Sequence, residues 1–241
     1  MNYDPKRIQG LKRELEDKAV TEIILSAHKK FGDKLAMTTA FGYSGIVLMS
    51  FVKDIVPEMP IYFIDTRYHF EETLKLAEKI KKEWKLNIIY LSTKYTEKEL
   101  EKIIGKETYK TNPDLCCQYR KIEPLLGVLK TKDAWLSAIR RDQSRTRESI
   151  DVVEIDNRGI IKINPIYNWT KFQTWMYIRK YDLPYNPLHD QYYPSVGCKP
   201  CTSPVDKGGD ERDGRWRNIP KVECGIHSYK EKDEKAEEGE E

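Results

Sequence analysis

Several features that would assign this chain to a broad class are missing. No apolar run approaches the roughly 20 residues that a membrane-spanning helix needs, and the first ten residues lack the apolar core of a signal peptide. An excess of one charge is also missing, because 42 Lys and Arg residues stand against 39 Asp and Glu residues. We therefore expect a cytoplasmic protein with no membrane contact and no general nucleic-acid surface.

Cysteine is scarce, with five residues in 241, and the odd number argues against a disulfide framework in a cytoplasmic chain. Cys116 and Cys117 are adjacent, Cys198 and Cys201 form a C-x-x-C pair, and Cys224 stands alone. Four thiolates in two pairs are typical of a tetrahedral sulfur site for zinc or for an iron–sulfur cluster. Adjacent cysteines favour the cluster, because their sulfurs can bind different iron atoms. The alternative is that they are buried small apolar side chains.

The order of the expected elements indicates an α/β fold with a doubly wound, mainly parallel sheet. Apolar strands alternate with helices through the first two thirds of the chain, and a hairpin follows. After residue 184, Pro, Gly and Tyr predict a loop-rich C-terminal extension. The expected strands cover 35–40, 60–65, 87–92, 134–139, 152–155 and 160–163, and the expected helices cover 19–30, 45–55, 70–84 and 171–181, with a further helix starting at Pro5.

Hydroxyl and glycine residues follow the first expected strand. Thr38, Thr39, Phe41 and Gly42 lie in a turn whose backbone N–H groups can bind an anion at the start of a helix. Neither a Walker A motif nor G-x-G-x-x-G is present, so an ordinary strand–helix connection is the alternative. Asp65 ends the next strand and is expected at the same crevice, unless it only caps the helix that follows.

Arginines and a lone thiol are the remaining candidates. Arg140 and Arg141 follow the fourth strand, where their guanidinium groups suit an oxyanion. Arg212 and Arg215 precede Cys224 by a few residues, and they are either surface charges or groups that close over phosphates together with the thiol. A lone cysteine is usually inert. Here Lys221 and His227 can lower the pKa of Cys224 and so favour a nucleophilic thiolate, and His227 is also a candidate substrate contact.

Lys121 comes four residues after Cys117. We expect it to lie near both the cysteine pairs and the crevice. There its ammonium group can pair with thiolate charge or with a sulfate.

Five short segments, taken together, are typical of one enzyme family. They are CCQYRKIEPL at 116–125, RRDQS at 140–144, LPYNPLH at 183–189, GCKPCT at 197–202 and ECGIH at 223–227. On these segments the chain resembles the adenylylsulfate (APS) and 3′-phosphoadenylylsulfate (PAPS) reductases over about 38–227. The resemblance implies an adenine-nucleotide α-hydrolase-like (PP-loop) fold and a [4Fe–4S] cluster on Cys116, Cys117, Cys198 and Cys201, with Cys224 as nucleophile.

The resemblance further implies that Arg212 and Arg215 contact phosphates and that Lys121 lies beside the cluster. The implied reaction is thiol-dependent reduction of PAPS or APS to sulfite through an S-sulfocysteine, in assimilatory sulfate reduction for cysteine biosynthesis. Thioredoxin or a similar dithiol protein is the implied partner, and a homo-oligomer stays open. We accordingly expect a nucleotide- and cluster-binding domain over 1–210, a mobile catalytic segment over 211–228, and a disordered charged tail over 229–241.

The choice between APS and PAPS rests on two opposed features. Four cluster cysteines usually accompany APS, whereas TTAFG at 38–42 and FIDT at 63–66 are more similar to the PAPS-using branch. We favour PAPS, because that loop would touch the ligand. Two other functions stay as alternatives: an ATP-dependent PP-loop sulfurtransferase, whose Ser-Gly-Gly-x-Asp-Ser loop is not found at 42–45, and a four-cysteine zinc module that binds a partner or nucleic acid.

Overall fold

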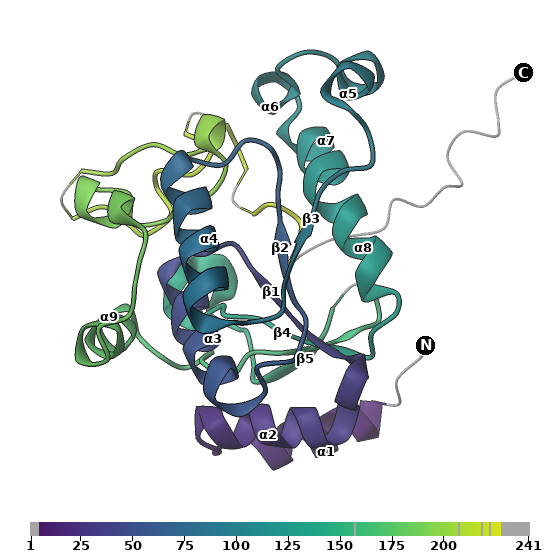
Figure 1. Cartoon of the computed structure of the whole chain (residues 1–241), viewed down its shortest axis with the longest axis vertical. Helices are drawn as coiled ribbons and strands as arrows, with labels where there is room; N and C mark the ends of the chain where they lie inside the picture. Colours follow the sequence, from purple (N-terminus) through teal and green to yellow (C-terminus); the bar gives the residue numbers. More distant parts are fainter. Residues whose placement is uncertain (1–4, 157, 207, 218, 222, 228–241) are drawn as a thin grey trace, which may run out of the picture.

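A single mixed sheet forms the centre of the fold (Figure 1). The computed structural model describes residues 5–156, 158–206, 208–217, 219–221 and 223–227. Within them six strands lie in the order β3-β2-β1-β4-β6-β5, all parallel except β5, which is antiparallel to β6. No helix in these ranges is both long and apolar enough to span a bilayer.

The sheet has short strands, and most helices are short as well. The strands are β1 Leu35–Thr39, β2 Ile61–Ile64, β3 Ile88–Leu91, β4 Ala134–Leu136, β5 Val153–Ile155 and β6 Ile161–Ile163. The helices are α1 Pro5–Leu15, α2 Val20–Phe31, α3 Tyr43–Ile55, α4 Glu71–Trp84, α5 Glu97–Ile104, α6 Thr108–Thr111, α7 Pro113–Cys117, α8 Glu123–Leu129 and α9 Lys171–Lys180.

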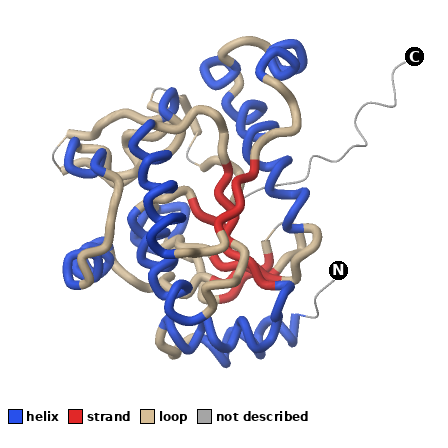
Figure 2. Tube along the Cα trace, viewed as in Figure 1, coloured by secondary structure: helices blue, strands red, loops and turns tan. Residues whose placement is uncertain are grey.

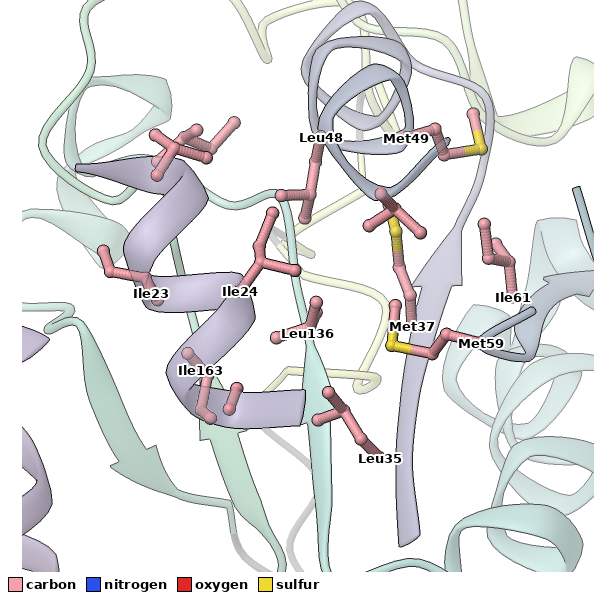
Figure 3. Packing of buried hydrophobic residues seen from close by; sticks show 14 of the residues in the cluster. Ile23, Ile24, Leu35, Met37, Leu48, Met49, Met59, Ile61, Leu136 and Ile163 are labelled. Carbon is pink, nitrogen blue, oxygen red and sulfur yellow. The ribbon is translucent and has the colours of Figure 1, made fainter. Parts of the chain in front are cut away.

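Both faces of the sheet are buried, as a parallel sheet requires. Because side chains alternate along a strand, Met37 of β1 and Leu136 of β4 face one core, which α2, α3 and α4 complete. Figure 3 shows the side chains of α2 and α3 pointing toward these strand residues. On the other face Trp135 and Ile64 pack against Leu125 of α8. Each such apolar side chain contributes about 1.5–3 kcal/mol by leaving water.

The helices therefore form layers on either side of the strands, with α3 and α4 on one face and α8 on the other (Figures 1 and 2). The expected strands, the hairpin and the expected helices are confirmed, and their ends differ from the expected ones by at most three residues. Helices α5 to α8 were not predicted. Their segments are short and frequently interrupted, although the capping box of Thr96 and Glu99 at the start of α5 was a readable signal. The expected tail at 229–241 lies outside the described residues.

Candidate active site

The candidate site lies where three neighbouring strands end. The chain runs from β1 outward to β2 and β3 and then returns to place β4 on the other side of β1. This reversal creates a crevice at the carboxyl ends of the strands, where open α/β sheets bind ligands. One pocket is lined there by Thr39 at the end of β1, Thr66 after β2 and Ser137 after β4, together with residues from the C-terminal extension. We call it the strand-end pocket.

The turn after β1 lies in the strand-end pocket, as predicted. Thr38, Thr39 and Gly42 line it, and α3 begins directly afterwards with Gly42 as its N-cap. The hydroxyl of Thr39 accepts a hydrogen bond from the backbone N–H of Phe41 at 3.1 Å, which shapes the turn. The ring of Phe41 is buried against Phe63 instead of lining the pocket. The turn can thus offer backbone N–H groups and a helix start to an anion.

Two of the predicted ligand contacts point elsewhere. Asp65 does not line the strand-end pocket, and its carboxylate accepts a hydrogen bond from the backbone N–H of Arg67 at 2.8 Å. Arg141 turns away from the pocket: its Nε donates to the carbonyl of Ile150 at 2.7 Å, and its guanidinium covers the ring of Tyr167. In each case another part of the protein binds the polar group that the sequence interpretation had assigned to the ligand.

Arg140 is fully buried behind the pocket wall. Its Nη2 donates to the hydroxyl of Tyr43 at 2.8 Å and pairs with Glu211 at 3.0 Å, and its Nε pairs with Asp142 at 2.9 Å. Nη1 also donates to Ser44 in the first turn of α3. Arg140 therefore ties the nucleotide turn to the C-terminal extension, and it does not line the strand-end pocket, where it was predicted to contact the ligand.

The two cysteine pairs converge beside the strand-end pocket. Cys116 and Cys117 end α7, and both are buried. Cys198, also buried, lies 3.3 Å from the hydroxyl of Thr66, and the backbone N–H of Cys201 donates to the Cys198 carbonyl to close the C-x-x-C turn. Cys198 and Cys201 both influence the pKa of Cys116, so thiols from segments far apart in the sequence share one region.

Four thiols are a donor set that would fit either an iron–sulfur cluster or a zinc ion. Burial raises the pKa of Cys116 to about 11 and that of Cys117 to about 12, so these thiols need a cationic centre to ionise at neutral pH. Among the residues that the structure describes, no three His, Cys, Asp or Glu side chains surround one ion position. Four iron atoms hold their thiolates farther apart than one tetrahedral ion does.

The extension brings its arginines back over the pocket. Residues Thr202 and Arg215 form an antiparallel bridge, and a Cβ at Gly214 would come within 2.1 Å of the carbonyl of Ser203. The guanidinium of Arg215 lies directly on Gly197, where a Cβ would meet it at 2.3 Å. Close packing at these two glycines places Arg215 next to the C-x-x-C turn and in the lining of the pocket.

Glu223 anchors the segment that carries the lone thiol. Its carboxylate accepts from Nε and Nη2 of Arg147, both at 2.9 Å, and pairs with Arg212 at 3.2 Å. All three groups, the carboxylate and both guanidinium groups, line the strand-end pocket together with Cys224. Two guanidinium groups around one carboxylate leave a surplus of positive charge, which an anionic ligand would meet. The sequence interpretation missed Arg147, although Arg147 is the last residue of the RRDQSRTR segment that begins at Arg140.

Cys224 has different electrostatics from the paired cysteines. Burial by itself would raise its pKa, but the ammonium of Lys121, a backbone hydrogen bond at Ile226 and the guanidinium of Arg215 together hold the pKa below its ordinary value. Lys121 is buried in the π-helical segment Gln118–Ile122 that follows α7, and it lines the pocket, as predicted. The arrangement favours the thiolate at this cysteine, and a thiolate is the nucleophilic form.

His227 does not act on Cys224 in the manner expected. Burial, together with the charges of Arg147, Lys162 and Arg158, lowers the pKa of His227 well below its usual range, so the ring is neutral. The imidazole lines the pocket and stacks on Trp135 with ring centroids 5.7 Å apart. The cations that favour the Cys224 thiolate are instead Lys121 and Arg215. His189, another pocket residue that the sequence interpretation missed, also has its pKa lowered by burial, to about 4.

Replacing Lys121 with methionine should shift the reactivity of Cys224 to higher pH. A lowered pKa means that the thiolate persists to lower pH, and losing the ammonium removes the largest of the effects that lower it. The measurement is the rate of iodoacetamide labelling of Cys224 against pH, followed by peptide mass spectrometry. Lys98→Met, on the exposed face of α5, is the matched control. An unchanged midpoint in Lys121→Met would show that Lys121 does not act on this thiol.

Comparisons with known proteins bear on the family of the chain. A family model described as a phosphoadenosine phosphosulfate reductase domain matches residues 34–204. Adenosine 5′-phosphosulfate reductase of Halalkalibacterium halodurans is 43% identical over 222 residues, 91% of this chain and 96% of that protein. Phosphoadenosine 5′-phosphosulfate reductase of Gloeobacter violaceus is 41% identical over 232 residues, 95% of this chain and 96% of that protein.

Solved structures add the fold. PAPS reductase from Candida auris in a phosphate complex has a TM-score of 0.75 and 30% identity, covering 85% of this chain and 99% of that one. FMN adenylyltransferase of Candida glabrata, at 14% identity, has a TM-score of 0.58 over 89% of this chain and 76% of that one, and shares the fold alone. The predicted PP-loop type of α/β fold is confirmed. On the family model and both relatives, the chain belongs to the APS/PAPS reductase family of oxidoreductases.

Proposed function

We propose that the chain reduces an adenylylated sulfate to sulfite by taking the sulfo group onto Cys224. One observation carries the proposal: Cys224 lies in the same pocket as the nucleotide turn after β1, together with Lys121, Arg212 and Arg215. A phosphosulfate bound by the turn would bring its sulfur toward the thiol. The cations would neutralise its oxygens, so that an anionic nucleophile can approach.

The first step is attack by the Cys224 thiolate on the sulfo sulfur. A bond forms between Sγ and that sulfur, and the bond from sulfur to the phosphate oxygen breaks. The nucleotide leaves with the electron pair, as AMP or as adenosine 3′,5′-bisphosphate. Arg212 and Arg215 are suited to hold the phosphate as its charge grows, because guanidinium groups bind phosphate oxygens in pairs.

The second step requires a dithiol, for which we propose thioredoxin or a similar protein. Its thiolate attacks Sγ of Cys224, which forms a mixed disulfide and expels sulfite. The second thiol of the partner then displaces Cys224 as a thiol. The dithiol is oxidised to a disulfide and supplies both electrons, so the reaction balances without another reductant.

The paired cysteines have a separate role in this proposal. Cys116, Cys117, Cys198 and Cys201 would hold a [4Fe–4S] cluster. When bound, the cluster would link α7 to the C-x-x-C turn and add its charge beside Lys121. The buried Arg120, whose guanidinium pairs with Glu97 and covers the ring of Tyr68, lies on the Cys116 side of this region.

The substrate proposal is tested by mixing the purified enzyme with APS or PAPS in the absence of any dithiol. We expect one sulfo group to be added to the peptide that contains Cys224, with one equivalent of nucleotide released. Because relatives of both names match the chain, the two nucleotides are compared side by side. The sequence of the turn at 38–42 leads us to expect the larger adduct yield from PAPS. Nucleotide release without an adduct on Cys224 would rule out this scheme.

A further inference from the structure

The turn between β5 and β6 holds a buried ion pair outside the strand-end pocket. Asp156 accepts hydrogen bonds from Nε and Nη2 of Arg158 at 2.9 and 2.7 Å, and the two side chains are 2% and 5% exposed. The same carboxylate accepts from the indole N–H of Trp135 at 3.0 Å. Burying two charges is costly even when they are paired, and a turn needs only its backbone hydrogen bonds.

Arg158 reaches from this turn to the segment that carries Cys224. Its Nη2 donates to the carbonyl of Ile226 at 3.0 Å, a residue 68 positions later in the chain. The side chain of Ile226 packs against the core on the same face of the sheet, and His227 stacks on Trp135. Since Asp156 holds both Arg158 and Trp135, one buried carboxylate supports the carbonyl contact and the stacking surface together.

Little freedom remains between this contact and the thiol. Gly225, which separates Cys224 from Ile226, has a φ of 81°, a conformation that favours glycine. A Cβ at Gly225 would come within 2.8 Å of Cδ1 of Ile122. The backbone at Gly225 is therefore packed closely against Ile122, and Cys224 lies between two anchored residues, Glu223 before it and Ile226 after it.

We propose that Arg158 is a positioning residue that keeps Cys224 in the strand-end pocket by holding the carbonyl of Ile226. This inference rests on the proposed function of Cys224. The other anchor, Glu223, uses Arg147 and Arg212, which line the pocket and are available to an anionic substrate that competes with the carboxylate. Arg158 does not line the pocket. The hydrogen bond from Arg158 to Ile226 therefore persists when substrate is bound. Cys224 stays in the pocket while Arg147 and Arg212 exchange the Glu223 carboxylate for the substrate.

The test is Arg158→Ala. Without substrate, iodoacetamide labelling of Cys224 should become about tenfold faster, because losing a charged hydrogen bond lets the segment leave the pocket. Single-turnover transfer of the sulfo group should become about tenfold slower. The affinity for AMP should not change, since Arg158 is remote from the nucleotide turn. Arg158→Lys keeps one donor and should restore part of both rates. Arg179→Ala, on α9, is the arginine control.

The Arg158→Ala protein is expected to fold. Asp156 retains the indole N–H of Trp135 and the backbone N–H groups at 158 and 160 as donors, at 2.9 to 3.1 Å. If the variant folds and the rates of labelling and of sulfo transfer are both unchanged, Arg158 only stabilises the turn between β5 and β6, and the inference is overturned. A different result separates the two proposals. Faster labelling of Cys224 in the variant would support the positioning role of Arg158. If the unmodified enzyme then formed no sulfo adduct, the proposed function alone would be overturned.

Discussion

Cys224→Ser should lower the rate of sulfite release by about 10³-fold or more, because a serine hydroxyl stays protonated at neutral pH and is a much weaker nucleophile than a thiolate. The substitution changes one atom, so the contacts of Glu223 with Arg147 and of Ile226 with Arg158 should remain. The measurement is sulfite production from PAPS and from APS with reduced thioredoxin.

Two controls keep this result specific. AMP should bind the variant with the affinity of the unmodified enzyme, because the nucleotide turn at 38–42 is unchanged. Visible absorption of the variant should match that of the unmodified enzyme, since Cys224 is not among the proposed cluster ligands. Sulfite release within about tenfold of the unmodified rate would show that another group accepts the sulfo group.

Arg140→Met should lower the free energy of unfolding by about 3–5 kcal/mol, the usual cost of removing one partner from a buried charge network. The guanidinium is fully buried and serves Glu211, Asp142 and Tyr43 at once. Glu211 is itself only 8% exposed, so its carboxylate would lose its cation inside the protein. Urea denaturation measures the change.

The neighbouring arginine provides the matched control. Arg141 is 45% exposed, and its closest carboxylate is that of Asp151, at 3.8 Å. Arg141→Met should therefore cost no more than about 1 kcal/mol. Equal losses in the two variants would contradict the assignment of Arg140 as the residue that locks α3 to the C-terminal extension.

The contrast between these two arginines shows what the sequence can and cannot predict. Their position after β4 follows from local patterns, since an apolar strand and its end can be read from neighbouring residues. Their directions depend on partners far away: Glu211 is 71 positions from Arg140. Likewise Glu223 meets Arg147 across 76 positions. Such pairs have no local sequence signature. The roles of Arg147 and Arg158 were therefore not predicted, and Arg141 was wrongly predicted to contact the ligand.

Other residues were predictable because a motif carried them. Lys121, Arg212, Arg215 and the turn with Thr38 all line the pocket with Cys224, as expected from the resemblance and from the rule that ligands bind at strand ends. The prediction that Asp65 contacts the ligand is wrong for a local reason: an Asp carboxylate readily accepts a hydrogen bond from the backbone N–H two residues later, here that of Arg67. His227 lines the pocket, where it was predicted as a substrate contact, but burial and neighbouring cations keep its ring neutral, so it adds no positive charge beside Cys224.

The distribution of the pocket along the chain has a consequence for biosynthesis. The nucleotide turn follows β1, near the beginning, whereas Glu223 and Cys224 come after every strand and helix that supports them. On the ribosome, the sheet is therefore translated before the reactive thiol exists, and domains can fold as they emerge. A polypeptide truncated before Glu223 would keep the strands and the paired cysteines, yet Arg147 and Arg158 would have lost the groups that they dock.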